Sequence, residues 1–428
     1  MVGLITLIAC GAALAPQAPP RMTDDGLLDE VERRACLFFQ ERSNSRTGLA
    51  SDRANNRGSD KYTVASTAST GYALASLPIA VERKWAKREG AEKRAVTTLR
   101  FVLDGMPNVH GWLYHFVDGA TGARVWNSEV STVDTSLLVA GALVCGQYFG
   151  GEVRDLANRL YDRLDWQWAR TNGSKKPDKR VVTMGWTPEK GFIPSNWDSY
   201  CELMVIYLLG LGARNNPLPA SSWAAWKRPE YTYGGITTLA GGPIFMHQMA
   251  HAFYDFHDRR DDLGYDYWIS SVEATRINRQ FCIDHLKTRS TYAPNIWGLN
   301  ASDGPDGYKA YGVPDPEDGT VSPTGALASI LFTPKLSIAA AREMYEKYGD
   351  RIWGRYGFAD SFNVDRKWFD PDVIGIDLGM VLLAIENHRT GLIWKLMRSH
   401  LSTTRGLAAA GLRTTREPAP RLLRLAPR

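Results

Sequence analysis

The sequence lacks the features that mark several common functional classes. Its five cysteines are widely separated and form no Cys-x-x-Cys pair, so neither a disulfide framework nor a zinc cluster is predicted. After the N-terminal segment no run of about 18 apolar residues occurs, which excludes an internal transmembrane helix. No Gly-x-Ser-x-Gly or P-loop motif is present, and nothing supports serine-hydrolase or nucleotide chemistry. With 51 basic and 46 acidic side chains, the small net charge of +5 predicts no nucleic-acid partner.

Aromatic residues, by contrast, are plentiful. There are 14 Trp, 18 Tyr and 14 Phe, in a chain of which 44% is hydrophobic and 23% charged. This composition is typical of a globular protein long enough for one large domain or a few smaller ones. Most of the rings must pack in the core, but flat apolar faces with a polar edge also suit sugar binding.

The first twenty residues, MVGLITLIACGAALAPQAPP, are a short apolar stretch followed by small residues and prolines. This pattern predicts a secretory signal, and Leu7 to Cys10 resembles a lipobox with Cys10 as the lipidated residue. We therefore expect residues 1–22 to be a signal or lipoprotein-like segment and linker, and the protein to be exported as a periplasmic or outer-membrane lipoprotein. The alternative is an unstructured N-terminal tail.

Helical periodicity dominates the rest of the chain. It predicts twelve helices, followed by a further helical piece at 390–400: 27–43, 64–82, 90–106, 131–149, 152–169, 197–212, 220–228, 243–258, 266–287, 323–332, 335–348 and 373–387. Odd members carry one charged face, whereas even members are apolar or small nearly all round, which is typical of enclosed helices. This alternation of outer and inner helices predicts an all-α fold, an (α/α)6 toroid, over residues 23–398. The Arg-rich segment 399–428 is predicted to be a disordered or loosely packed tail.

In such a ring the inner helices run in the same direction, so polar residues at their N-termini should meet at one face. Glu129, Asp134 and Asp377 lie near the starts of even helices, and so does a cluster made of Trp197, Tyr200 and Glu202. Long loops rich in aromatic and acidic residues lead into these helices, which is typical of a binding site on a rigid scaffold.

The acids also have structural interpretations. Asp134 follows Ser131 in a Ser-x-x-Asp capping box, and Glu202 follows Ser199 in a similar pattern. Glu202 precedes an unbroken apolar run, so partial desolvation should raise the pKa of its carboxyl group. Asp377 is expected one turn inside a helix that begins at 371 or 372, where it needs a ligand or an Arg partner.

His247 and His251 are spaced four residues apart, as in the zinc motif His-Glu-x-x-His, but Gln248 replaces the catalytic Glu. No metal site and no cofactor are therefore predicted. Hydrogen bonding of His247 and Gln248 to substrate hydroxyls or to core carbonyl groups is the preferred interpretation.

Several segments together resemble the glycoamylase-like proteins of glycoside hydrolase family 144. They include SEVSTVDTSLLVAG (128–141), NWDSYCELMVIYLLGLG (196–212), GGPIFMHQMAHAFYDFHDRRD (241–261), DGTVSPTGALASI (318–330) and GIDLGMVLLAIENHRTGLIW (375–394). The resemblance spans about residues 29–397. It implies the (α/α)6 toroid and an anomer-inverting endo-hydrolysis of β-1,2-glucan, with Glu202 as the acid and Asp377 as the base candidate. Glu129 and Asp134 match an acidic helix start in the same site.

The substrate-binding candidates are polar and aromatic residues of the same loops and helix starts. They are His115, Arg124, Trp126, Trp197, Tyr200, His247, Gln248, Asp303 and Tyr308. The expected partner is a β-glucan oligo- or polysaccharide, and the protein is expected to be a monomer with a lipid anchor at Cys10. A β-1,2-glucan transglycosylase, another β-glucosidase-type activity and a non-catalytic glycan-binding lipoprotein remain alternatives.

Overall fold

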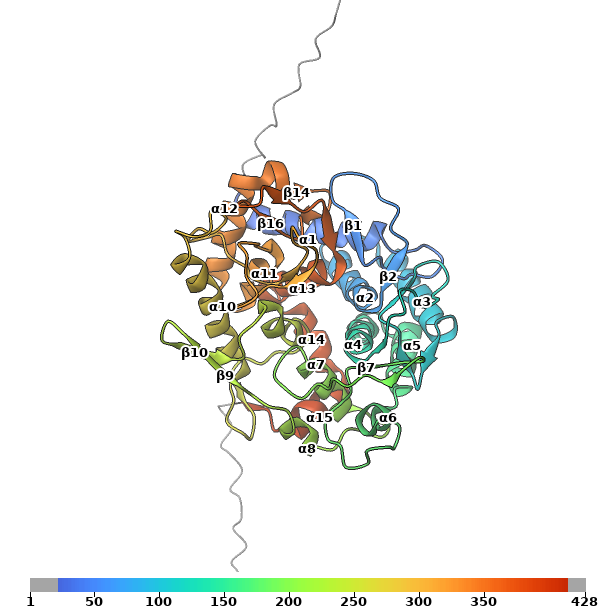
Figure 1. Cartoon of the computed structure of the whole chain (residues 1–428). Helices are drawn as coiled ribbons and strands as arrows, with labels where there is room; N and C mark the ends of the chain where they lie inside the picture. Colours follow the sequence, from blue (N-terminus) through green and yellow to red (C-terminus); the bar gives the residue numbers. More distant parts are fainter. Residues whose placement is uncertain (1–21, 415–428) are drawn as a thin grey trace, which may run out of the picture.

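The computed structural model describes residues 22–414, which form a predominantly helical fold (Figure 1). The helices are α1 (Asp24–Glu41), α2 (Thr67–Glu82), α3 (Arg88–Asp104), α4 (Thr132–Phe149), α5 (Gly151–Asp162), α6 (Trp166–Thr171), α7 (Met204–Gly212), α8 (Ser221–Ala224), η1 (Ile244–His247), α9 (Met249–Phe253), α10 (Tyr267–Asp284), α11 (Pro323–Ala328), η2 (Ser329–Leu331), α12 (Pro334–Ile352), α13 (Gly375–Arg389), α14 (Leu392–Ser399) and α15 (Leu401–Ala409). The predominantly helical character expected from the sequence is confirmed.

Short strands occur in the loops between the helices and pair into two- and three-stranded sheets. They are β1 (Arg53–Asn55), β2 (Val64–Ser66), β3 (Asn108–Val109), β4 (Trp112–Leu113), β5 (Phe116–Asp118), β6 (Val130–Ser131), β7 (Gly185–Thr187), β8 (Gly191–Phe192), β9 (Glu230–Tyr233), β10 (Ile236–Leu239), β11 (Arg259–Arg260), β12 (Ala301–Ser302), β13 (Lys309–Ala310), β14 (Trp353–Gly354), β15 (Gly357–Phe358), β16 (Phe362–Asn363), β17 (Trp368–Phe369), β18 (Asp372–Ile374) and β19 (Arg413–Thr414). They are too short for sequence periodicity to predict.

The inner helices contact one another in a closed circuit. Each inner helix contacts the next: α2 contacts α4, α4 contacts α7, α7 contacts α9, α9 contacts α13, and α13 contacts α2. α11 packs on α13. In Figure 1 the helices α2, α4, α7, α11 and α13 lie toward the middle, whereas α1, α3, α5, α10 and α12 lie at the periphery. The alternation expected from the sequence thus corresponds to an inner and an outer layer of helices.

Small residues let α2 and α4 approach closely. A Cβ atom on Gly141 would lie 1.9 Å from the carbonyl oxygen of Gly71, so neither position tolerates a side chain without a shift. Nearly every residue of α4 is buried, whereas α5 buries only one face. By length and composition α4 could cross a membrane, but 83% of it is buried within the protein, as expected of a core helix.

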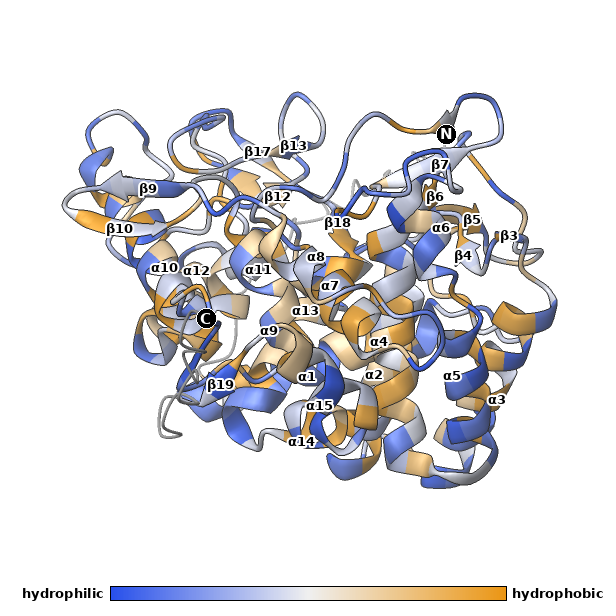
Figure 2. Cartoon of the chain, turned by 90° about the horizontal axis from the view of Figure 1, so that it is seen from below, coloured by the Kyte–Doolittle hydropathy of each residue, from blue (hydrophilic) through white to orange (hydrophobic). Residues whose placement is uncertain are grey.

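The loops and most of the short strands gather at one end of the helices, and α14 and α15 lie at the opposite end (Figure 2). Three inner helices begin directly after a strand: α2 after β2, α4 after β6 and α13 after β18. β18 pairs with β1 in antiparallel register, with Arg53 opposite Ile374 and Asn55 opposite Asp372. The loop end therefore carries the starts of these inner helices.

Several predicted helices have different boundaries. The helix expected at 197–212 begins only at Met204, because 200–203 forms a bend and turn. The one expected at 243–258 is split into η1 and α9 and ends at Phe253. The one expected to start near 371 begins at Gly375, because 372–374 pairs with β1.

The prediction of a disordered tail from residue 399 is wrong for the described part of that segment. α15 packs against α7, where a Cβ atom on Gly406 would lie 2.2 Å from the carbonyl oxygen of Leu208. β19 then pairs with β11. The prediction overlooked that Gly and Ser in this segment permit close helix contact. Residues 415–428, like the proposed signal segment 1–21 with Cys10, lie outside the described residues.

Candidate active site

Asp134 lies in the first turn of α4 and is almost fully buried. The backbone N–H of Asp134 donates to Ser131 Oγ at 3.3 Å, and the Ser131 hydroxyl donates to the Asp134 carboxylate. The predicted cap is therefore confirmed. It uses Asp134 Oδ2 and leaves Oδ1 directed toward His115, at 3.5 Å from Nε2.

His115 lies between two carboxylates. Its Nδ1 is 3.0 Å from Glu129 Oε1, and its Nε2 faces Asp134. Burial alone would lower the pKa of His115, but the charge of Asp134 and the hydrogen bond to Glu129 raise it to about 9. In turn, the hydrogen bond from His115 lowers the pKa of Glu129. This group of three is an ion network with His115 protonated at neutral pH.

Glu202 lies in the turn that precedes α7. The structure shows no side-chain cap at the start of this helix, so the capping role predicted for Ser199 and Glu202 is wrong. The chain bends before Met204, and Glu202 as a whole residue is half-buried there. Burial of its surroundings, together with the negative charge of Asp134, raises the pKa of Glu202. The carboxyl group is thus biased toward the protonated form.

Asp377 is the third residue of α13 and is 4% exposed. Asn300 Nδ2 donates to Asp377 Oδ1 at 3.3 Å. Among the described residues no Arg or Lys forms an ion pair with it, so the salt-bridge alternative is not observed. Burial and the charges of Asp52 and Asp303 raise the pKa of Asp377 to about 8.

Four further residues of this region were missed by sequence analysis. Arg53 Nη1 lies 2.7 Å from Asp303 Oδ2, and Arg53 Nε lies 3.2 Å from Asp52 Oδ2. Asp360 is 1% exposed and accepts a hydrogen bond from the backbone of Asp303. Asp370 is also buried, and burial raises its pKa to about 7. The sequence signals were Asp360 in YGFADSFN and Asp370 in FDPD, which became meaningful only once the loops were placed.

These acids belong to one continuous electrostatic environment. The charges of both Asp377 and Asp134 raise the pKa of Tyr72, which is fully buried on α2. The charge of Asp134 also acts on Glu202, and that of Asp52 acts on both His115 and Asp377. The first turns of α4 and α13 and the turn before α7 therefore converge, as the shared direction of inner helices predicted.

Two exposed aromatic side chains border this environment. The Trp126 side chain is 66% exposed and packs at 5.2 Å against Phe116, which stacks on His115 at 3.8 Å between ring centroids. Tyr308 is 59% exposed, and after burial the charge of Asp377 is the next largest influence that raises the pKa of its hydroxyl. Both rings are available to a ligand.

Other predicted binding residues are committed to internal contacts. Trp197 is buried and donates from Nε1 to Thr132 Oγ1 at 2.8 Å. Tyr200 is also buried, with its hydroxyl 3.1 Å from His247 Nδ1. Gln248 donates to the Gly325 carbonyl and to Ser329 at 2.7 Å, which matches its core interpretation.

Arg124 forms a two-pronged ion pair with Glu189 and donates to the carbonyl of Ser128. It thereby ties the loop before α4 to the turn between β7 and β8. The structure gives Arg124 no direct role at the acids. His247 is buried as well, and burial lowers its pKa to about 4, so this imidazole is neutral.

Two groups have the donor types and spacing of a cation site. Donor atoms of His115, Glu129 and Asp134 lie within 4.8 Å of one another, and so do those of Asp303, Asp360 and Asp370. Each group already holds a cationic side chain, protonated His115 in the first and Arg53 beside Asp303 in the second. We assign no metal to either.

Several known proteins resemble this chain in sequence and in structure. The Glycoamylase family, described as "Putative glucoamylase", matches residues 194–401. A protein named "putative glucoamylase" from Bacteroides uniformis has a crystal structure with 30% sequence identity and a TM-score of 0.86, covering 92% of this chain and 99% of its own. An endo-β-1,2-glucanase from Chitinophaga pinensis, solved with sophorotriose and glucose, has 26% identity and a TM-score of 0.85, with 92% and 99% coverage.

A curated relative from Parabacteroides distasonis is named exo β-1,2-glucooligosaccharide sophorohydrolase (non-reducing end). It is 29% identical over 90% of this chain, and the match spans 58% of the length of that relative. By its sequence match and its shared structure over nearly the whole length, the chain belongs to the glycoamylase-like family, glycoside hydrolase family 144.

Proposed function

We propose that this protein is a glycoside hydrolase that cleaves β-1,2-linked glucans. The endo-β-1,2-glucanase and the sophorohydrolase among its relatives act on this class of substrate by their names. The acids at the starts of α4, α7 and α13 supply the carboxyl groups that glycoside hydrolysis requires. The exposed rings of Trp126 and Tyr308 offer faces on which sugars can stack.

We infer that the inner and outer helices form an (α/α)6 toroid with this site at its loop end. The closed circuit of contacts from α2 through α13 supports this arrangement. So does the alternation of helices that are buried all round with helices that are buried on one face. A ring of parallel inner helices explains why residues as distant in sequence as Asp134 and Asp377 act on the same tyrosine.

Hydrolysis needs one carboxyl group that donates a proton to the leaving oxygen and another that activates water. Glu202 is the proposed donor, because burial and Asp134 keep its proton on. Asp377 is the proposed acceptor of the water proton. Asn300 holds the carboxyl group of Asp377 from one side, which leaves Oδ2 available to a water molecule.

The environment of Asp377 makes it a strong but infrequently ionised base. With a pKa of about 8, most Asp377 carboxyl groups are protonated at pH 7. The ionised fraction that remains binds a proton more tightly than an ordinary aspartate does, which favours proton abstraction from water. Activity at neutral pH therefore depends on how the substrate changes the charge balance among Asp52, Asp303 and Asp377.

The observation that carries this proposal is the pair of raised pKa values, those of Glu202 and Asp377, at inner-helix starts that share one electrostatic environment. The test is incubation of wild type and Glu202→Gln with linear β-1,2-glucan, with product anomers followed by NMR. Wild type should release products of inverted configuration, and the variant should not. A ladder of product sizes would indicate endo action, and uniform sophorose would indicate exo action. Unchanged turnover by Glu202→Gln would contradict the assignment.

Export is also proposed, on the strength of the apolar, small-residue and Pro-rich sequence of residues 1–22. Fractionation of cells that express the full chain, with Cys10→Ala as a comparison, tests it. A lipid anchor predicts that the wild-type protein sediments with membranes and the variant does not.

A further inference from the structure

A pocket lies at the end of the molecule opposite the acids. It has a volume of about 270 Å³ and is built where α4 and α5 meet α14 and α15. Gln147 lines it from the last turn of α4, whereas Asp134 lies in the first turn of the same helix. At 1.5 Å per residue the two positions are about 20 Å apart along α4. The pocket is therefore distinct from the candidate active site.

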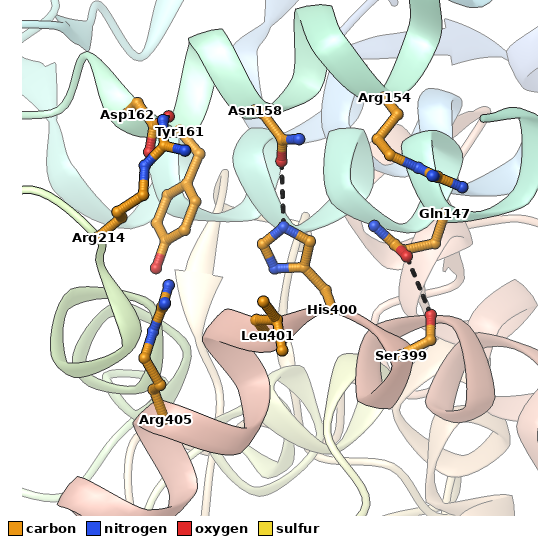
Figure 3. Close-up of a pocket in the computed structure, with 10 residues that line it drawn as sticks. All are labelled: Gln147, Arg154, Asn158, Tyr161, Asp162, Arg214, Ser399, His400, Leu401 and Arg405. Carbon is orange, nitrogen blue, oxygen red and sulfur yellow. Dashed lines mark hydrogen bonds and ion pairs between the residues drawn. The ribbon is translucent and has the colours of Figure 1, made fainter. Parts of the chain in front are cut away.

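Three arginines supply the charge of this pocket. Arg154, Arg214 and Arg405 line it, and Asp162 is the one carboxylate among the described lining residues. Asp162 pairs with Arg214, which leaves a net charge of +2. Figure 3 shows Arg214 and Arg405 on one side of His400 and Arg154 on the other.

Much of the hydrogen-bonding capacity of these arginines is unused. Among the described residues, the Arg154 guanidinium forms no hydrogen bond or ion pair. Arg405 donates through Nε to the Gly212 carbonyl at 3.1 Å, and its two terminal nitrogens have no described partner. A guanidinium presents paired N–H donors in a plane, a geometry that matches two oxygens of a phosphate.

His400 holds the centre of the pocket in a fixed orientation. Its Nε2 lies 3.1 Å from Asn158 Oδ1 and its Nδ1 lies 2.6 Å from Ser402 Oγ. Since the amide oxygen of Asn158 accepts, Nε2 carries the proton. Burial and the positive charge of Arg405 lower the pKa of His400, so the imidazole is neutral at pH 7. Part of this lowering reflects the positive charge of the pocket.

We propose that this pocket binds a phosphate dianion, either free phosphate or the phosphate of a small monoester. Arg154 contacts the dianion, and the amide of Gln147 and the hydroxyl of Ser399 complete the polar lining on the same side of His400. Arg405 adds positive charge from the other side of His400. The volume greatly exceeds the ~30 Å³ that one water occupies, so a short carbon chain on the phosphate is also accommodated. This inference does not depend on the proposed hydrolase activity.

Isothermal titration calorimetry of the full chain at pH 7 and 150 mM NaCl tests the proposal, with phosphate, glucose 6-phosphate and glucose as probes. Saturable binding of phosphate or glucose 6-phosphate is expected, and Arg154→Gln should weaken it at least tenfold. Arg159→Gln, a surface change on the same helix that does not line the pocket, should stay within twofold of wild type. Equal affinity for the two phosphates identifies the bare dianion as the ligand. Tighter binding of glucose 6-phosphate identifies a monoester.

A second readout uses the ring protons of His400 in a pH titration by NMR. A dianion beside the imidazole should raise the pKa of His400, and Arg405→Gln, which removes one positive charge from the pocket, should weaken the effect. Absence of saturable binding would overturn the proposal. So would binding of glucose alone, or binding that Arg154→Gln leaves unchanged.

Discussion

His115 Nε2 lies 3.5 Å from Asp134 Oδ1, which joins the loop before α4 to the first turn of that helix. Asp134 is also the residue whose N–H is capped by Ser131. The same carboxylate thus belongs to the helix cap, to the ion network of His115 and to the electrostatic environment of Glu202. A change at Asp134 therefore alters both local stability and the protonation of a proposed catalytic group.

Removing the proton donor should abolish most activity. We predict that Glu202→Gln lowers kcat/KM on β-1,2-glucan by about 10³-fold, equivalent to about 4 kcal/mol of transition-state stabilisation. The fold should remain intact, since Glu202 caps no helix. Steady-state kinetics and circular dichroism check this.

The matched control is Glu89→Gln on the exposed face of α3, which should retain wild-type kinetics. A further check uses an aryl β-sophoroside, whose leaving group needs little protonation. The Glu202 variant should lose less activity on this substrate than on glucan. An equal loss on both would show that Glu202 is not the acid.

The pH dependence of kcat/KM should follow the ionisation of Asp377. The pKa of this group is raised above its usual value to about 8, so its ionised form accumulates as the pH rises through 8. As a base, Asp377 predicts that kcat/KM rises about tenfold per pH unit below 8 over the range in which Glu202 keeps its proton. Asp52→Asn removes one negative neighbour and should move this limb to lower pH.

One outcome would contradict the role of Asp377. If Asp52→Asn left both limbs of the pH profile where they lie in wild type, Asp377 would not be the base. Asp377→Asn supplies the reference, since it should remove the limb altogether.

His115 should stabilise the fold in a pH-dependent way. Its pKa is raised in the folded protein from 6.5 to about 9, so the stabilisation is complete below pH 6.5 and is lost as the pH rises through 9. The full difference corresponds to at most about 3 kcal/mol, and partial exposure of the ring reduces it. Urea unfolding of wild type and His115→Gln at pH 6 and pH 10 measures it.

The control is the same pair of proteins in an Asp134→Asn, Glu129→Gln background. Without the two carboxylates, the difference in stability that His115→Gln causes should no longer depend on pH between 7 and 10. A pH dependence that persisted there would assign the effect to another part of the protein.

Trp126 should affect substrate binding rather than folding. Its side chain is 66% exposed, and stacking of a sugar on an aromatic face contributes about 1 kcal/mol. We expect Trp126→Ala to raise KM about fivefold with little change in kcat or in Tm. Trp197→Ala is the contrasting variant, because it removes a buried ring and its bond to Thr132, and should lower Tm by several degrees.

The contact between α15 and α7 should be sensitive to side-chain size. Gly406→Val is expected to destabilise the protein by about 1–3 kcal/mol, because its Cβ would meet the Leu208 carbonyl at 2.2 Å. Ala408→Val, at an exposed position on the same helix, measures how much a β-branched side chain alone lowers the free energy of unfolding. Equal stabilities of the two variants would contradict the observed packing.

The sequence predicted the layers of the fold because buried and half-buried helices differ in composition, as α4 and α5 do. It also predicted that Asp134 and Asp377 share one site, since both begin inner helices. It could not predict that Trp197 and Tyr200 face the core, because the bend before Met204 sets their direction. Nor could it identify Arg53 as the partner of Asp303, since 250 residues separate them and only the folded loops bring them together.

The closed circuit of inner helices also determines how the protein responds to truncation. In an open helical repeat array each end unit has one neighbour and can often be deleted. Here α13 contacts both α1 and α2, so the last inner helix packs against the first helical hairpin. Removing any single hairpin would expose two apolar interfaces at once, and truncation from either side should yield an insoluble product rather than a shorter, stable intermediate.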